Sequence, residues 1–112
     1  MGDEARAAAL ATLERLGYVD DRRFATARAE ALAGRGHGDA WIRHDLAEHG
    51  LDGETVEEAL AALAPERERV AAIVDREGPS RRLAARLARK GFGADAVELA
   101  LEAQFADEAE RA

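Results

Sequence analysis

Apolar residues recur at intervals of three and four along the chain, and one such pattern occurs twice in the sequence. The first copy consists of Ile42, Leu46, Gly50, Leu51, Val56, Ala59 and Leu60, and the second of Leu83, Leu87, Gly91, Phe92, Val97, Ala100 and Leu101. Every pair is 41 positions apart, as Gly50 and Gly91 are. A partial third copy, with Leu10 and Leu13, precedes Leu60 and Leu63 by 50 positions. Such repeats are typical of helical arrays in which no unit buries its apolar face alone, so we expect the units to pack through their apolar sides.

Glycine, proline and capping residues divide the chain into seven expected helices. These helices cover about residues 3–16, 20–33, 39–49, 52–63, 65–77, 80–90 and 92–106. Gly17 is expected to end the first helix, and Asp20 to cap the second, with Val19 and Phe24 forming a hydrophobic staple. No stretch shows the period-two alternation of a strand. The predicted fold class is therefore all-α, with tandem three-helix repeats.

The spacing of the repeats predicts one helical-repeat domain over residues 1–112. Residues 1–16 are expected to form the last helix of a truncated first repeat, residues 17–63 the second repeat and residues 65–106 the third. Residues 107–112 are expected to be a frayed acidic tail. The helix over residues 1–16 would lack its neighbours, which predicts an exposed apolar patch or a dimer contact there.

Charge and composition limit the classes of partner. The formal net charge is -7, which argues against a protein built to grip phosphate backbones. The segment from Ser80 to Ala94 nevertheless has five cations and no acid, namely Arg81, Arg82, Arg86, Arg89 and Lys90. This segment is either a contact surface for an acidic protein or a phosphate, or a solvated helix face. The absence of cysteine, of a signal peptide and of a membrane-length apolar run predicts a soluble cytoplasmic protein.

The remaining candidate sites are explained more simply by structure. Gly34, Gly36 and Gly38 could cradle a phosphate, but the phosphate-binding fingerprint needs a preceding strand, and here a helix is expected. The three histidines have no zinc-site spacing, and the Asp20–Asp21 pair suits a helix start better than acid-base chemistry. We therefore expect no enzyme activity, no cofactor, no metal and no small-molecule substrate. Trp41 is either an interface anchor or a lid on the neighbouring repeat, and its size favours the lid.

The assembled residues resemble the RecX family of regulators. The matching text begins with Leu16-Gly17-Tyr18-Val19-Asp20-Asp21 and Arg23-Phe24-Ala25, and continues with Gly36-His37-Gly38, Ile42-Arg43, Leu46 and Gly50-Leu51. It is echoed by Leu83, Leu87, Arg89-Lys90-Gly91-Phe92 and Val97. The resemblance covers nearly the whole chain.

This resemblance implies a short curved array of three-helix repeats that binds the RecA nucleoprotein filament and mainly inhibits its recombinase and ATPase activities. It implies no catalysis. Around the second helix of the middle repeat only Arg35 and Arg43 are basic. Family members usually carry a basic residue at the position of Trp41, Pro at the position of Asp39 and Lys at the position of His49. The expected partner-binding residues are Arg35, Trp41, Arg43, Arg81, Arg82, Arg86, Arg89 and Lys90. Alternative functions are a helical DNA-binding module with weak DNA contact, or an inactive structural fragment of such a regulator.

Overall fold

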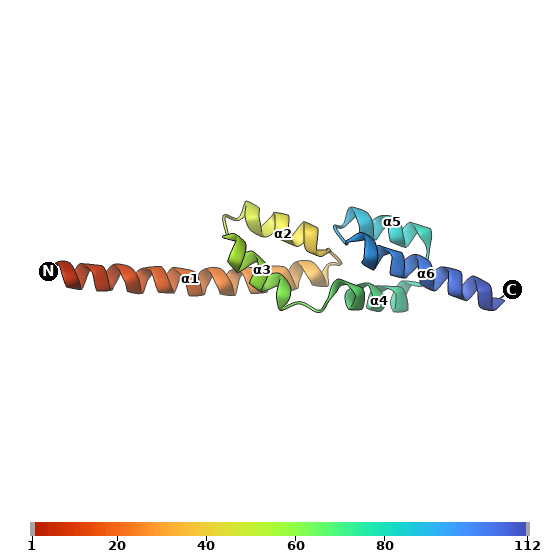
Figure 1. Ribbon diagram of the computed structural model, residues 1–112, viewed down its shortest axis with the longest axis horizontal. Helices are drawn as coiled ribbons and strands as arrows, with labels where there is room; N and C mark the ends of the chain where they lie inside the picture. The colour runs from red at the N-terminus through yellow and green to blue at the C-terminus, as the bar shows by residue number, and fades with distance from the viewer. Residues whose placement is uncertain (1, 112) are drawn as a thin grey trace.

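The protein is a rod of α-helices. A computed structural model describes the backbone of residues 2–111 and the side chains of residues 2–102. Its helices are α1 (Asp3–Gly34), α2 (Asp39–Glu48), α3 (Gly53–Ala61), α4 (Glu66–Glu77), α5 (Arg81–Arg89) and α6 (Ala94–Arg111). The principal extents are 80 × 19 × 18 Å (Figure 1). The described backbone has no strand, which confirms the all-α prediction.

The helices form two three-helix units. Helices α1, α2 and α3 pack together, and α6 packs against both α4 and α5. Ile42 and Leu83 are buried at 0% and 3% exposure, and Leu46 and Leu87 at 0% and 1%, so residues 41 positions apart occupy matching places. The same spacing relates buried residues of the first helices, Ala29 and Leu32 in α1 to Val70 and Ile73 in α4. The repeat predicted from the sequence is thus confirmed.

Three helices end in the same motif. Gly36, Gly50 and Gly91 have φ angles of 86°, 80° and 94°, which favour glycine. After each glycine the next amide donates to the carbonyl five residues back, as from Phe92 to Leu87 at 3.1 Å. The expected starts of two helices are also confirmed, since the Asp52 and Ser80 side chains accept from the amides of Thr55 and Leu83 at 2.8 and 2.9 Å. Pro65 directly precedes α4 and is not its first residue.

The expected helix end at Gly17 is wrong. Helix α1 is continuous over 32 residues, and Asp20 lies inside it, so neither the Asp20 cap nor the staple of Val19 and Phe24 forms. A glycine inside a helix costs only about 1 kcal/mol relative to alanine, and no proline or capping turn follows Gly17 to stop the helix. The division of the chain into repeats at residues 16 and 17 and at residues 63 and 65 stays a prediction. The fraying of residues 107–112 also stays a prediction.

The two units meet through backbone groups and not through a shared apolar core. One cluster of buried apolar residues lies within residues 25–60 and the other within residues 70–100, so the expected packing through apolar sides is wrong. Instead, the carbonyls of Lys90 and Gly91 at the end of α5 accept from the amides of Gly38 and Ala40 at the start of α2, at 2.8 and 3.1 Å. A Cβ on Gly38 would lie 2.4 Å from the Gly91 carbonyl carbon. Only glycine allows this approach.

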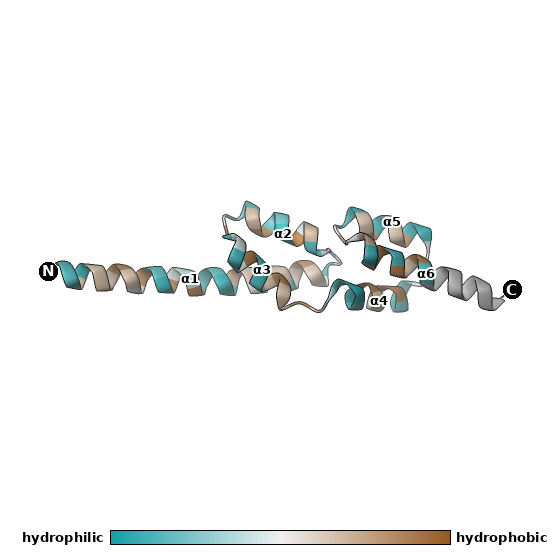
Figure 2. Cartoon of the chain, viewed as in Figure 1, coloured by the Kyte–Doolittle hydropathy of each residue, from teal (hydrophilic) through white to brown (hydrophobic). Residues whose placement is uncertain are grey.

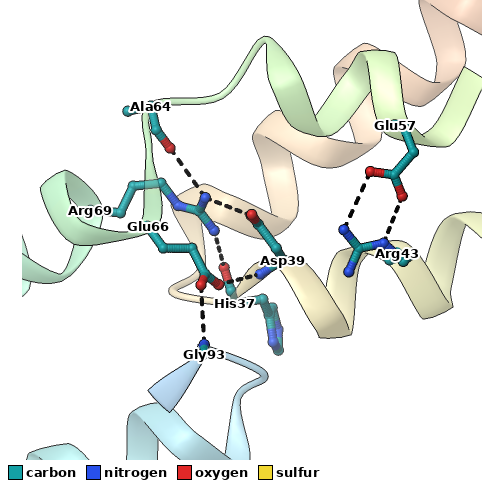
Figure 3. Close-up of polar contacts among 8 residues, drawn as sticks. All are labelled: His37, Asp39, Arg43, Glu57, Ala64, Glu66, Arg69 and Gly93. Carbon is teal, nitrogen blue, oxygen red and sulfur yellow. Dashed lines mark hydrogen bonds and ion pairs between the residues drawn. The ribbon is translucent and has the colours of Figure 1, made fainter. Parts of the chain in front are cut away.

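Two buried or half-buried side chains of α4 reinforce this junction. Glu66 accepts from the amides of Asp39 at 2.8 Å and Gly93 at 3.1 Å, so one carboxylate binds near the starts of both α2 and α6 (Figure 3). Arg69 donates to the Asp39 carboxylate at 2.8 Å and to the His37 carbonyl at 3.0 Å. Its side chain is 12% exposed. The Asp39 side chain is 34% exposed, so the ion pair is partly sheltered from salt. Because its two residues belong to different units, the pair stabilises their contact.

Replacing Gly38 with alanine is expected to loosen the junction without unfolding either unit. The Cβ would meet backbone atoms, which cannot move aside without moving α5. We expect the free energy of unfolding to fall by about 1–3 kcal/mol, a common cost for a steric misfit. Helical circular dichroism should be retained, and amide exchange at residues 38 and 40 should accelerate.

The matched control is Gly53→Ala at the start of α3, where a Cβ meets nothing within 4 Å. It should leave amide exchange at the junction unchanged. Unchanged exchange at residue 40 in Gly38→Ala would contradict the assigned role of the glycine.

Candidate partner-binding surface

Helix α5 presents a ridge of arginines because its apolar residues are turned inward. Leu83, Ala84 and Leu87 are buried in the apolar cluster that α5 shares with α4 and α6. Arg82, Arg86 and Arg89 follow at helical spacing and are exposed. The predicted alignment of these three arginines along one side of the helix is therefore present. We call them the arginine ridge.

The central arginine of the ridge is paired within its own unit. Arg86 donates to both oxygens of Glu77, at 2.7 and 2.6 Å. This hydrogen-bonded guanidinium lowers the pKa of the Glu77 carboxyl, although both side chains are more than two-fifths exposed and the pair is therefore screened. Arg81, Arg82 and Arg89 make no ion pair with the side chains of residues 2–102. These three cations are the available ones on α5.

A hollow lies beside the ridge, where α1 ends against α4 and α5. Its volume is about 290 Å³, and its charged lining residues are Arg35, Arg76, Glu77, Arg86 and Lys90. Lys90 spans the hollow and donates from Nζ to the Arg35 carbonyl at 2.7 Å. The lining has four cations and one acid, so the hollow extends the positive surface of the ridge. Sequence reasoning missed Arg76, which lies outside the acid-free segment.

The two remaining candidate residues lie on α2. Arg43 donates to both oxygens of Glu57, at 2.7 and 3.3 Å (Figure 3), and this bond lowers the pKa of the Glu57 carboxyl. Trp41 does not form the buried lid that its size favoured, because it is 46% exposed. Its backbone and Cβ lie against Gly91, while its ring stacks on His37 with the centroids 4.5 Å apart.

His37 is held in an environment that favours its neutral form. Burial lowers its pKa, as do the nearby charges of Lys90 and Arg35. Its Nδ1 is buried and has no hydrogen-bond partner among the described residues. The ring therefore supplies Trp41 with an uncharged stacking surface at neutral pH.

The basic ridge has no equivalent on α2. Trp41, Asp45 and Glu48 occupy the places that Arg82, Arg86 and Arg89 occupy 41 positions later. Asp45 accepts two hydrogen bonds from Arg28 at 2.8 Å each, and this guanidinium lowers the pKa of Asp45. Of the predicted partner-binding residues, the structure thus brings Arg35 beside Arg86 and Lys90. Arg43 and Trp41 lie on α2 of the other unit.

Neither a metal site nor a membrane span is found in the described residues. No group of three His, Asp or Glu side chains within them could hold a metal ion. No helix in the described part of the chain is long and apolar enough to cross a membrane. The surface around α5 is the strongest candidate that remains.

Comparison with known proteins places this architecture in a family. The sequence model of the RecX second three-helix domain matches residues 20–60, which include α2, α3 except its last residue, and nearly half of α1. The regulatory protein RecX of Xanthomonas citri is 35% identical over 113 residues, which cover 89% of this chain and 70% of that protein. The chain belongs to the RecX family.

Other RecX proteins are similar to the same extent. The regulatory protein RecX of Stenotrophomonas maltophilia R551-3 is 35% identical over 108 residues, covering 88% of this chain and 66% of that protein. That of Xanthomonas oryzae pv. oryzae PXO99A is 34% identical over 113 residues. The matches extend well beyond residues 20–60, so both three-helix units are RecX-like.

The stacked pair of His37 and Trp41 predicts a pH-dependent fluorescence signal. Trp41 is the only tryptophan, and a protonated imidazole quenches indole emission. Because the pKa of His37 is lowered, we expect emission to stay constant as pH falls through the usual histidine range near 6.5 and to drop only below it. The folded state binds this proton less readily than the unfolded state, so stability should also decline as pH falls below about 6.5.

His37→Asn should abolish the fluorescence transition, and His44→Asn, which removes an exposed histidine of α2, should leave it in place. A midpoint at or above 6.5 would contradict the assigned environment of His37.

Proposed function

We propose that this RecX-type regulator binds the RecA nucleoprotein filament in the cytoplasm and mainly inhibits its recombinase and ATPase activities. The observation that supports this proposal best is the basic surface formed by the arginine ridge and the adjacent hollow. This surface is positive in a chain of net charge -7, because Glu77 is the one acidic residue among those that line the hollow. Such a local surface suits an acidic partner while the overall charge disfavours indiscriminate binding to nucleic acid.

Within this surface, Arg82 and Arg89 are the residues that we expect to contact the filament. Both side chains are exposed, and neither forms an ion pair with the described side chains. Arg86 is positioned by Glu77 and contributes less, because a partner would have to compete with the hydrogen bonds that its Nη2 already donates to both carboxylate oxygens of Glu77. Lys90 donates a hydrogen bond to the Arg35 carbonyl, and both residues line the hollow.

Reversing one charge of the ridge should weaken filament binding. Arg82→Glu or Arg89→Glu is expected to lower the affinity about tenfold, because each places like charge against an acidic partner, and tenfold corresponds to about 1.4 kcal/mol. The measurement is co-sedimentation with RecA filaments assembled on single-stranded DNA, together with the RecA ATPase rate. Binding without inhibition would support the partner and contradict the regulatory activity.

The matched control is Arg67→Glu, which makes the same charge change at an exposed position in the first turn of α4. It should bind as the unchanged chain does. Single-stranded DNA without RecA is the second control, since a DNA-binding module would bind it at low salt and lose affinity steeply as salt rises. Equal binding to bare DNA and to the filament would contradict the proposal, and so would no binding to either.

A further inference from the structure

The first part of α1 exposes a row of leucines. Residues 2–24, which we call the arm, comprise the N-cap and the first part of α1. Most of the arm extends past α2 and α3, and near its end Arg22 pairs with Glu58 of α3 at 3.0 Å (Figure 2). Leu10, Leu13 and Leu16 are 60%, 63% and 57% exposed. Leucines three residues apart lie along one side of a helix, so they form a continuous apolar face. The exposed patch expected from the sequence is confirmed, and a face of this kind marks an interaction surface.

The apolar face has the spacing of a coiled-coil seam. The positions on this side of the helix are Arg6, Ala9, Leu10, Leu13, Leu16, Gly17 and Asp20. Arg6, Leu13 and Asp20 are seven residues apart, and the other positions lie three or four residues after Arg6 or Leu13. This is the heptad arrangement through which two helices pack side by side.

The seam is complementary to itself when one copy is reversed. Counting outward from Leu13, Leu10 is matched by Leu16 and Ala9 by Gly17. At the next seam position Arg6 is matched by Asp20. Two antiparallel copies would therefore place leucine on leucine, small residue on small residue, and opposite charges together at both ends.

The charges at the ends of the seam select this direction. Arg6 and Asp20 form no ion pair with the described side chains of their own chain. A parallel pair would set Arg6 against Arg6 and Asp20 against Asp20, which like-charge repulsion disfavours. Just outside the seam, Asp3 and Arg23 are also matched across Leu13 with opposite charge.

We propose that a second copy of this chain binds along the arm as an antiparallel coiled coil, with the two-fold axis at Leu13. The interface is isologous, since each copy contributes the same surface. In this register Gly2 of one copy lies opposite Phe24 of the other. Phe24 contacts His49 at the end of α2, with the ring centroids 5.2 Å apart, so the partner helix ends where α2 begins to cover α1. About 35 Å of helix overlaps without displacing either three-helix unit.

The test is sedimentation equilibrium of the full chain over a concentration series. We expect a monomer–dimer equilibrium for the unchanged chain. Leu13→Glu places two carboxylates on the axis and should give a monomer. Arg6→Asp should weaken the dimer about tenfold or more, and adding Asp20→Arg in the same chain should restore it, because the exchange recreates both ion pairs.

All three altered positions are exposed and helical, so circular dichroism should report unchanged folding. The matched control is Arg67→Asp on α4, which should leave the dimer intact. A monomer at every concentration would overturn the proposal, and so would failure of the charge exchange to restore the dimer. These results can be distinguished from those on RecA binding, because the surface proposed for the filament lies toward the other end of the rod.

Cross-linking tests the direction, and the chain has no cysteine of its own to interfere. With a short bismaleimide, Leu13→Cys should cross-link to itself. Leu10→Cys should cross-link to Leu16→Cys in a mixture and poorly to itself. Efficient self-linking of Leu10→Cys would indicate a parallel pair and overturn the antiparallel register.

Discussion

The close approach of two glycines fixes how the units are joined. Gly38 directly precedes α2 and Gly91 lies two residues after the end of α5. Their backbones lie so close that a Cβ on either would meet atoms of the other unit within 3 Å. This approach lets amides that a helix start leaves unpaired reach carbonyls that a helix end leaves unpaired. The dipoles of α5 and α2 are thereby aligned end to end. A polar junction of this kind lets each unit keep its own apolar cluster.

The two units differ most where equivalent residues have taken different charges. Arg28 and Arg69 are 41 positions apart on the first helices of the two units. Arg28 binds Asp45 inside its own unit, but the position equivalent to Asp45 is Arg86. Arg69 therefore reaches across the junction to Asp39, and Arg86 turns to Glu77. The presence of Arg86 in place of an aspartate equivalent to Asp45 thus leaves Arg69 available for the junction and also makes α5 basic.

Most of the fold could be predicted from the sequence, and the junction could not. The spacing of Ile42 and Leu83 identified matching buried positions because burial selects residue type, and residue type is visible in a sequence. The bonds from Gly38 and Ala40 are made by backbone groups, which every residue has, so they leave no signal beyond the glycine itself. The helix end predicted at Gly17 was wrong, because a glycine permits a helix to end but does not require it.

The sequence predicted which helix carries the positive charges, but not which of its arginines form ion pairs within the fold. The acid-free segment after Ser80 identified α5 as the basic helix. Which of its arginines are available depended on Glu77, whose place opposite Arg86 no local pattern indicates. The proposed pairing through the arm is compatible with this surface, because the arm and α5 lie toward opposite ends of the 80 Å rod (Figure 1). An antiparallel pair would carry its two arginine ridges at its far ends, separated by both arms, so that each could contact a different stretch of one long partner.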